Sequence, residues 1–233
     1  MTCTARADPQ ASRGDNGTGS RDNLTKAQER RREKLATFLI DLSPEDMERR
    51  LTDALGVYVD AMRYPRGTED QRVSMWLEHT RRAGWKAVAA VEVPDSAEPT
   101  TATAELAAAP IVGVAYGYCG APDQWWQQQV VAGLHRVGAE RSRISELMTS
   151  YFELTELHID PPAQGRGLGE ALARRLLAGR AEAHVLLSTP EINGEANRAW
   201  RLYRRLGFTD VIRGYHFAGD PRPFAILGRA LPL

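Results

Sequence analysis

Several features that mark particular classes of protein are missing from this sequence. It has 2 cysteines in 233 residues, and its 30 basic and 30 acidic side chains leave a formal net charge of zero. Two cysteines, Cys3 and Cys119, indicate neither a disulfide framework nor a metal site, which fits a reducing environment. A neutral chain offers no overall field to attract nucleic acid or an anionic membrane. We therefore expect a cytoplasmic protein with no metal and no nucleic-acid partner.

Long hydrophobic runs are missing as well. The N-terminus has no apolar segment of the kind that directs export. The longest weakly apolar stretch, residues 106–121, is interrupted by Pro110, Gly113 and Gly117 and is too short to span a membrane. With 42% hydrophobic and 26% charged residues, the composition is that of an ordinary globular protein. No membrane association is expected, and monomer and homodimer both remain open.

The chain divides into a tail and one domain. Residues 1–35 are poor in large apolar residues, which predicts a disordered or partly helical tail. Residues 36–233 are expected to form a single domain with an insertion at about 121–150. Four apolar residues of this insertion are predicted to share one helical face: Trp126, Val130, Leu134 and Val137.

Apolar periodicity in the domain predicts a mixed α/β fold. Strands are expected over residues 37–42, 87–93, 111–119, 151–160, 185–189, 209–217 and 224–231. Helices are expected after Ser43, from Thr68, over 167–183 and over 195–206. The last two strands can pair as a hairpin. This order of elements predicts a mixed sheet with helices on both faces.

The most informative stretch runs from Leu157 to Gly169 and reads LHIDPPAQGRGLG. A strand leads through two prolines into three glycines spaced two apart, and an apolar-striped helix follows. Such a turn leaves backbone N–H groups unpaired at the positive end of the helix dipole. Glycine lets the main chain approach an anion without interference from a Cβ atom. The stretch therefore predicts a turn that binds a diphosphate.

Two familiar diphosphate motifs do not fit this turn. A P-loop ends in Gly-Lys-Ser/Thr, where this chain has Gly169, Glu170 and Ala171. A dinucleotide fingerprint needs glycine or alanine at the position of Glu170. A carboxylate at that position would repel a pyrophosphate at close range.

The pattern Gln-x-x-Gly-x-Gly, preceded by Leu-x-Ile-x-Pro, resembles the acetyl-coenzyme A signature of the GNAT superfamily of N-acetyltransferases. A second block, residues 197–208 (NRAWRLYRRLGF), is similar to the late helix of that superfamily. It has an asparagine near its start, a tyrosine, and a final Gly-Phe. The resemblance covers roughly residues 37–233 and is specific from Tyr151 to Phe208.

The resemblance implies a mostly antiparallel, seven-stranded sheet whose fourth and fifth strands splay apart to admit pantetheine. It also implies an N-acetyltransferase that moves an acetyl group from acetyl-CoA to a primary amine by direct attack in a ternary complex. The insertion is a departure from the compact form of the family. The positions that the resemblance assigns to the cofactor are Leu157, His158, Ile159, Gln164, Gly165, Arg166, Gly167, Leu168, Gly169 and Asn197.

These positions have distinct expected roles. The resemblance implies that main-chain groups of the fourth strand bind the pantetheine amides and that the glycine turn holds the pyrophosphate, with Arg166 available for phosphate charge. Asn197 is expected beside the pantetheine, although an asparagine at this place also suits a helix cap.

Acetyl transfer needs a neutral amine, a donor that stabilises charge on the thioester oxygen, and a proton for the leaving thiolate. By resemblance, Tyr203 is the general acid, although its helical spacing equally suits a core tyrosine. Glu153 stands where some members of the superfamily carry a base. Strand alternation places Glu153 and Glu156 on opposite faces, and Glu156 shares its face with His158. A structural role for either carboxylate, with deprotonation through water, is an open alternative.

The acceptor is left open between a small-molecule amine and a protein lysine or N-terminus. It is expected near residues 63–67, the insertion with Trp125 and Trp126, and the hairpin around Tyr215 and His216. Alternatively, the tryptophans anchor the insertion to the core. A second function, a catalytically silent sensor or scaffold that binds acyl-CoA, would carry the same motifs and would not need Tyr203.

Overall fold

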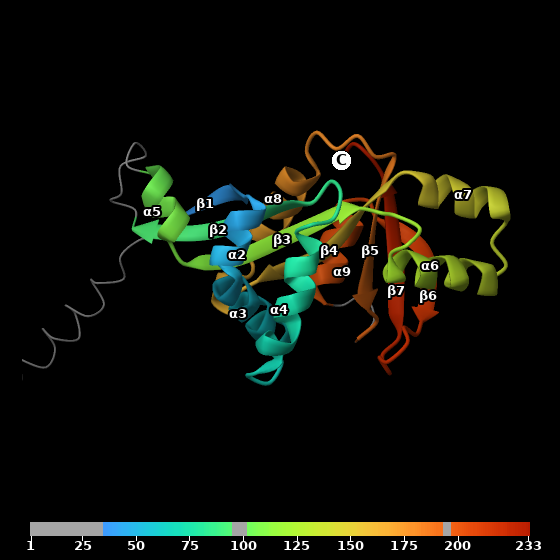
Figure 1. Ribbon diagram of the computed structural model, residues 1–233, viewed down its shortest axis with the longest axis horizontal. Helices are drawn as coiled ribbons and strands as arrows, with labels where there is room; N and C mark the ends of the chain where they lie inside the picture. Colours follow the sequence, from blue (N-terminus) through green and yellow to red (C-terminus); the bar gives the residue numbers. More distant parts are fainter. Residues whose placement is uncertain (1–34, 95–101, 193–196) are drawn as a thin grey trace, which may run out of the picture. The chain divides into compact units, whose positions relative to one another are not determined.

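Figure 1 shows the computed structural model of the chain, which describes residues 35–94, 102–192 and 197–233. The predicted disordered or partly helical tail lies outside the described residues, apart from Leu35. Ala36–Leu233 form one compact unit. In the described ranges no helix is long and apolar enough to cross a membrane. In the same ranges no three His, Cys, Asp or Glu side chains are grouped so that they could hold a metal ion.

The described residues form a seven-stranded sheet in the order β1-β2-β3-β4-β5-β7-β6. Its strands are β1 (Leu35–Leu42), β2 (Lys86–Pro94), β3 (Ile111–Cys119), β4 (Tyr151–Ile159), β5 (His184–Pro190), β6 (Thr209–Tyr215) and β7 (Phe224–Ala230). β4 and β5 run parallel, whereas the pairs β2/β3, β3/β4, β5/β7 and β6/β7 are antiparallel. The predicted mixed, mostly antiparallel α/β fold is therefore confirmed.

Helices cover both faces of this sheet. They are α2 (Pro44–Arg49), α3 (Leu51–Met62), α4 (Thr68–His79), α5 (Ala102–Ala108), α6 (Trp125–Arg136), α7 (Arg141–Thr149), α8 (Leu168–Leu177) and α9 (Arg198–Arg205), with a short 3-10 turn at Pro161–Ala163. α3 and α4 pack on the face of β2 and β3, and α6 and α7 pack over β5, β6 and β7. α8 and α9 cover the opposite face, behind the sheet in Figure 1.

Local sequence explains where the first helix begins. Ser43 Oγ accepts a hydrogen bond from the Asp46 N–H, and Asp46 Oδ2 accepts one from the Ser43 N–H, both at 3.1 Å. This reciprocal capping box satisfies two backbone donors that a helix start would otherwise leave unpaired. The helix is interrupted at Arg50, whose guanidinium donates to the carbonyl oxygens of Ala107 and Ala109 at 2.6 Å. The single predicted helix is therefore two, α2 and α3.

The insertion forms α6 and α7, and its predicted apolar face is only partly correct. Trp126, Val130 and Leu134 are buried, and Val130 has no exposed surface. Val137 is 59% exposed, because α6 ends at Arg136 and the chain turns away from the sheet. The prediction that Val137 lies on the apolar face of the helix is wrong, because it extended the helical periodicity one residue beyond the end of α6.

The sheet is split between β4 and β5. The two strands pair only from Tyr151 with His184 to Glu153 with Leu186. β4 nevertheless continues to Ile159 along β3. Its last residues therefore have no described strand beside them on the β5 side. The expected splaying of these two strands is confirmed.

One extra residue, Thr155, interrupts the ladder between β3 and β4. A β-bulge of this kind shifts the alternation of side chains by one position. Glu153 pairs with Tyr118 and Glu156 pairs with Tyr116, and these two tyrosines lie on the same face of β3. Both carboxylates therefore point to the face that α3 and α4 cover. The prediction that they lie on opposite faces is wrong, because it assumed an unbroken strand.

Candidate active site

The glycine turn forms a set of unpaired donors at the start of α8. Gly165 and Gly167 have φ angles of 84° and 81°, a left-handed conformation that favours glycine. Gly167 is the N-cap of α8 and supplies no side-chain cap. The main-chain N–H groups of residues 165–169 donate no hydrogen bond to any described residue. We call this set of donors, at the positive end of the helix dipole, the anion seat.

The space around the seat suits an anion. A Cβ atom added at Gly167 would meet nothing within 4 Å, and one added at Gly165 would meet only the Arg198 guanidinium, at 3.9 Å. Gly169 is different, because its added Cβ would lie 3.0 Å from Leu202 Cδ2 on α9. The first two glycines therefore keep the turn open, whereas the third lets α8 pack against α9. These observations fit the diphosphate of a coenzyme.

The open edge of β4 leads towards the seat. The Asp160 N–H donates to the Val112 carbonyl at 2.9 Å, so Asp160 faces β3. Main-chain groups alternate along an antiparallel ladder, so those of His158 also face β3 and those of Leu157 and Ile159 face the split. The Gln164 side-chain amide donates to the Ile159 carbonyl at 3.0 Å, which agrees with this direction. Leu157 and the Ile159 N–H are left to bind a ligand between β4 and β5.

Two charged residues of the turn are already paired. The Arg166 guanidinium donates to Glu92 Oε1 and to Thr37 Oγ1, towards β1 and β2. Glu170 accepts hydrogen bonds from Arg174 at 2.9 Å and from Arg205 at 3.2 Å. These two bonds hold the pKa of the Glu170 carboxyl below its usual value and balance its charge. The Glu170 carboxylate therefore repels an anion in the seat less than its position in the sequence indicates.

Asn197 is the N-cap of α9, the alternative that its position also allowed. Its Oδ1 accepts from the Trp200 N–H at 2.9 Å, and its Nδ2 donates to the Ile192 carbonyl at 3.3 Å. The Asn197 amide nitrogen has a second hydrogen, which is available for a hydrogen bond to a cofactor. That contact stays a prediction.

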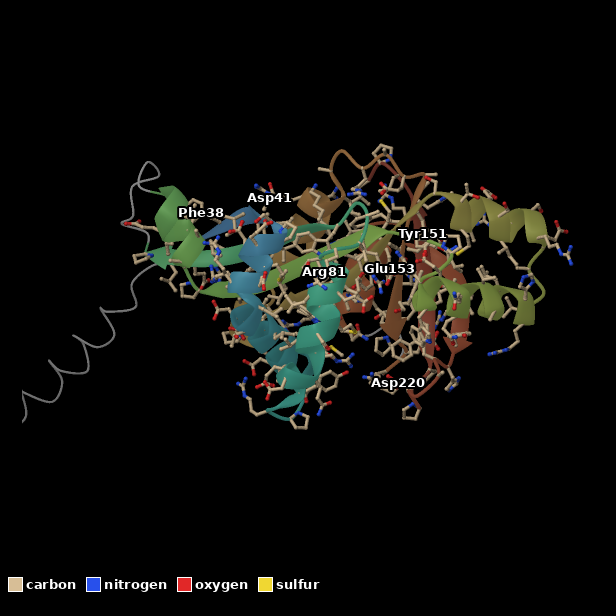
Figure 2. The ribbon with its side chains drawn as sticks, viewed as in Figure 1. Phe38, Asp41, Arg81, Tyr151, Glu153 and Asp220 are labelled. Atoms are coloured by element: carbon tan, nitrogen blue, oxygen red, sulfur yellow. The ribbon has the colours of Figure 1, made fainter. Side chains whose placement is uncertain are left out.

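Glu153 is buried beneath α4 and beside the split, near the centre of Figure 2. Its side chain accepts a hydrogen bond from the Tyr118 hydroxyl at 3.3 Å, and its other oxygen has no described partner. Burial raises the pKa of Glu153 to about 8, although the charge of Arg82 and the Tyr118 hydrogen bond act in the opposite direction. A carboxyl that titrates near neutral pH is suited to general acid–base chemistry.

Glu156 lies on the same face and is paired with a histidine. Its Oε2 is 2.5 Å from His158 Nε2, and the His158 ring packs edge-to-face on Tyr58, with ring centres 5.0 Å apart. After burial, the Glu156 charge is the next cause that raises the pKa of both Tyr116 and Tyr203. The Glu156 charge therefore acts both on a tyrosine of β3 and on a tyrosine of α9.

Tyr203 extends from α9 into the core. Its side chain is 7% exposed and packs against Phe208, with ring centres 5.6 Å apart. Burial, and then the charge of Glu156, raise the pKa of the Tyr203 phenol well above its ordinary value. No hydrogen bond joins the phenol to another described side chain or backbone group. A neutral phenol in this state can donate a hydrogen bond to a ligand, whereas its ionised form is unfavourable.

Several residues of this region were not found from the sequence. His79 Nδ1 lies 3.0 Å from the Tyr116 hydroxyl, and burial lowers the pKa of His79 to about 4, so that the imidazole is neutral. The Arg82 guanidinium lies 4.6 Å from the ring centre of Tyr118. The signal that would have found the tyrosines is their position on β3, opposite Glu153 and Glu156. His79 and Arg82 gave no such signal, because helix packing brings them there.

The hairpin contacts both of the other regions expected to form the acceptor site, beginning with residues 63–67. The Arg222 guanidinium, in the loop between β6 and β7, donates to the Tyr64 hydroxyl between α3 and α4 at 3.1 Å. Arg222 is also bound by Asp220, at 2.6 Å, which Figure 2 labels at the end of the hairpin. The two loops are thus linked.

The tryptophans of the insertion behave differently from each other. Trp126 is buried, and its indole N–H donates to Ser188 Oγ on β5 at 3.3 Å, so it anchors α6 to the sheet. Trp125 is 52% exposed and packs against Phe217, with ring centres 5.6 Å apart. The Tyr215 hydroxyl donates to Gln129 at 3.2 Å and joins the same contact between insertion and hairpin.

Comparison with known proteins agrees with this geometry. Residues 114–210 match the family model described as an acetyltransferase (GNAT) domain. The GCN5-like protein acetyltransferase Rv2170 of Mycobacterium tuberculosis (strain ATCC 25618 / H37Rv) is 75% identical over 206 residues, which covers 85% of this chain and 100% of that protein.

Solved structures show the same fold at low sequence identity. A protein of Acinetobacter baylyi ADP1 whose proposed activity is acetyl transfer superposes with a TM-score of 0.53 at 13% identity, over 85% of this chain and 93% of that one. A GNAT-family protein of Desulfovibrio desulfuricans superposes with a TM-score of 0.50 at 16% identity, over 84% and 99% of the two chains.

Proposed function

Because the chain belongs to the GNAT acetyltransferases, we propose that it acetylates a primary amine by direct attack on acetyl-CoA within a ternary complex. It is an acyltransferase, and acetyl-CoA is its co-substrate. Acetyl-CoA supplies the acetyl group as a thioester, which an amine attacks without a covalent enzyme intermediate. The remaining steps fall to side chains and backbone groups of this chain.

The observation that carries the proposal is the position of the anion seat. It follows the end of β4, beyond the part of the strand that pairs with β5, whereas Glu153 lies at the last paired position and Glu156 lies three residues further on. A ligand anchored in the seat and extended along the open edge of β4 would place its far end near these groups. A coenzyme with a pantetheine arm has a phosphate anchor at one end and its reactive group at the other.

We assign the cofactor contacts accordingly. The N–H groups of Gly165, Arg166, Gly167, Leu168 and Gly169 hold the pyrophosphate, as helix N-termini commonly hold phosphate groups. The main chain of Leu157 and Ile159 binds the pantetheine amides as an added strand would, and the main chain of His158 maintains the ladder to β3. The Gln164 side chain fixes the turn through its hydrogen bond to the Ile159 carbonyl. Asn197 contacts the pantetheine arm.

We assign Glu153 as the general base. An alkyl amine is mostly protonated at neutral pH, so one proton must leave before the nitrogen can attack. The pKa of Glu153, about 8, is close to the working pH, where a base transfers protons most effectively. Glu153 is buried, so we assign its proton transfer to a relay through water rather than to direct contact with the amine. Glu156, held by His158, shares the face and attracts the cationic amine.

We assign Tyr203 as the general acid. Its phenol has no hydrogen-bond partner among the described residues and remains protonated, so it can give its proton to the departing sulfur. The second proton that the amine nitrogen loses as the amide forms then returns to the phenol. Positioning of the two substrates side by side supplies a large share of the rate, because effective molarities of about 10⁵ M or more are reached by well-oriented groups.

The name of the Mycobacterium relative supports a protein amine, either a lysine or an N-terminus, as the acceptor.

The test is release of the coenzyme A thiol from acetyl-CoA in the presence of lysine peptides, free peptide N-termini and small amines. We expect the wild type to release thiol with at least one acceptor and Tyr203→Phe to be about 10²-fold slower or more. Tyr151→Phe is a matched control, because it removes a buried hydroxyl that donates to Gln127 at 3.0 Å, outside the proposed machinery.

Each result has a distinct meaning. A wild type that binds acetyl-CoA but releases thiol with no acceptor would favour a silent coenzyme-binding sensor. Equal rates for the wild type and Tyr203→Phe would remove Tyr203 from the mechanism and leave the function intact.

A further inference from the structure

Arg198 lies beside the anion seat, a position that the motif does not assign. It is the first residue of α9 and is exposed. Its Nη1 donates to Gln164 Oε1 at 3.1 Å and lies 3.9 Å from where a Cβ atom of Gly165 would be. The guanidinium therefore occupies the side of the turn that the missing side chain of Gly165 leaves free.

The other cations around the seat have carboxylate partners. Arg166 is paired with Glu92, and Arg174 and Arg205 are both paired with Glu170. Arg198 has no carboxylate partner among the described residues, and its only hydrogen bond there is to the neutral amide of Gln164. Within the described ranges, therefore, no carboxylate compensates its positive charge at the point where unpaired N–H groups already favour an anion.

We propose that the guanidinium of Arg198, rather than that of Arg166, binds the pyrophosphate of the coenzyme. This inference rests on the proposed function, because it takes coenzyme A as the occupant of the seat. A guanidinium presents five N–H donors, so the bond to Gln164 leaves others for phosphate oxygens. An Arg–phosphate contact adds charge-assisted hydrogen bonds to those from the backbone.

Gln164 acts as the positioning residue for Arg198. Its Nε2 is held by the Ile159 carbonyl at the end of β4, which fixes the side-chain oxygen that receives the Arg198 hydrogen bond. This contact joins the glycine turn to the start of α9, that is, the first sequence motif to the second. Arg166 would have to break its pair with Glu92 before it could serve the same role.

The experiment measures affinity rather than activity. Isothermal titration of the full chain with coenzyme A and with 3′-dephospho-coenzyme A is compared for the wild type, Arg198→Gln, Arg198→Lys, Arg166→Gln and Arg143→Gln. Arg198→Gln keeps an N–H donor for Gln164 but has no charge, whereas Arg198→Lys keeps the charge. Arg143→Gln removes the same charge from an exposed position on α7, outside the seat, and thermal melting checks that each variant is folded.

We expect Arg198→Gln to bind both coenzymes about 10-fold more weakly, as loss of a charge-assisted hydrogen bond predicts. Arg198→Lys should recover part of this loss, Arg166→Gln should lose less affinity than Arg198→Gln, and Arg143→Gln should stay within about twofold of the wild type. The loss should shrink as salt is added, because the contact is partly exposed.

Wild-type affinity in Arg198→Gln would overturn the inference, and so would a larger loss in Arg166→Gln. A loss confined to coenzyme A, with dephospho-coenzyme A unaffected, would also overturn it, because the contact would then be to the 3′-phosphate. If the wild type bound neither coenzyme, the proposed function would fail and this inference with it.

Discussion

Replacement of Glu153 by glutamine is expected to stabilise the protein at alkaline pH while it slows acetyl transfer. Glu153 is 4% exposed, and one of its oxygens has no described hydrogen-bond partner. A buried carboxylate in this state is costly when it is ionised, and an amide of similar shape avoids that cost. The residue thus lowers stability in the pH range in which it can act as a base.

The sign and the pH window follow from the raised pKa. The pKa of Glu153 is about 8 in the folded protein, against 4.5 for an unperturbed carboxyl. The folded state therefore holds the proton more tightly than the unfolded state does. The favourable contribution of this group is complete below about pH 4.5 and is lost as the pH rises to about 8. The difference between the two pKa values corresponds to roughly 5 kcal/mol at most.

The assay is urea denaturation of the wild type and Glu153→Gln at a series of pH values from about 5 to 9. We expect the free energy of unfolding of the variant, minus that of the wild type, to rise with pH and to level off above the folded-state pKa. Other groups titrate in both proteins, so their contributions cancel in the difference. The same samples should show slower acetyl transfer by the variant, by about 10²-fold or more.

A surface carboxylate provides the control. Glu146 is exposed and pairs with Arg143 at 3.0 Å, so Glu146→Gln should change stability by less than about 1 kcal/mol at every pH. A stability difference for Glu153→Gln that does not vary with pH would refute the reasoning, because it would mean that the buried carboxyl does not titrate in this range.

The remaining predictions concern the seat, the loops and the first helix. Gly167→Val forces a branched side chain into a left-handed conformation, with free space around it. Coenzyme A titration should therefore show at least about 10-fold weaker binding in a folded protein. Unchanged affinity would contradict the anion seat. Tyr64→Phe removes the bond to Arg222 and should raise KM for the acceptor without changing coenzyme A affinity; a change in both would show that the loops act on the whole site. Ser43→Ala should lower the free energy of unfolding by about 1 kcal/mol in urea titration and leave the rate unaltered, and no loss would argue against the capping box.

Features that depend on a few neighbouring residues could be predicted from the sequence. Strand β3 has the predicted bounds, Ile111–Cys119, and Ser43 caps the helix that its pattern indicated. The glycine turn stands at the start of a helix, as the sequence indicated, and two of its glycines, Gly165 and Gly167, have positive φ angles. The side-chain partners of the turn could not be predicted, because they come from distant strands and helices. Arg166 turns to Glu92 on β2, and only the packing of α9 brings Arg198 to Gln164.

The bulge at Thr155 shows why a small irregularity matters for function. Without the extra residue, Glu153 and Glu156 would point to opposite faces, and one of them would enter the core beneath α8 and α9. With it, both carboxylates lie on the face of Tyr116 and Tyr118. The paired part of β4 and β5 ends at Glu153, so the bulge also lies where the split begins. One inserted residue thus brings the two carboxylates to one face at the place where the sheet splits, and no periodicity in the sequence reveals an insertion in a ladder of two strands.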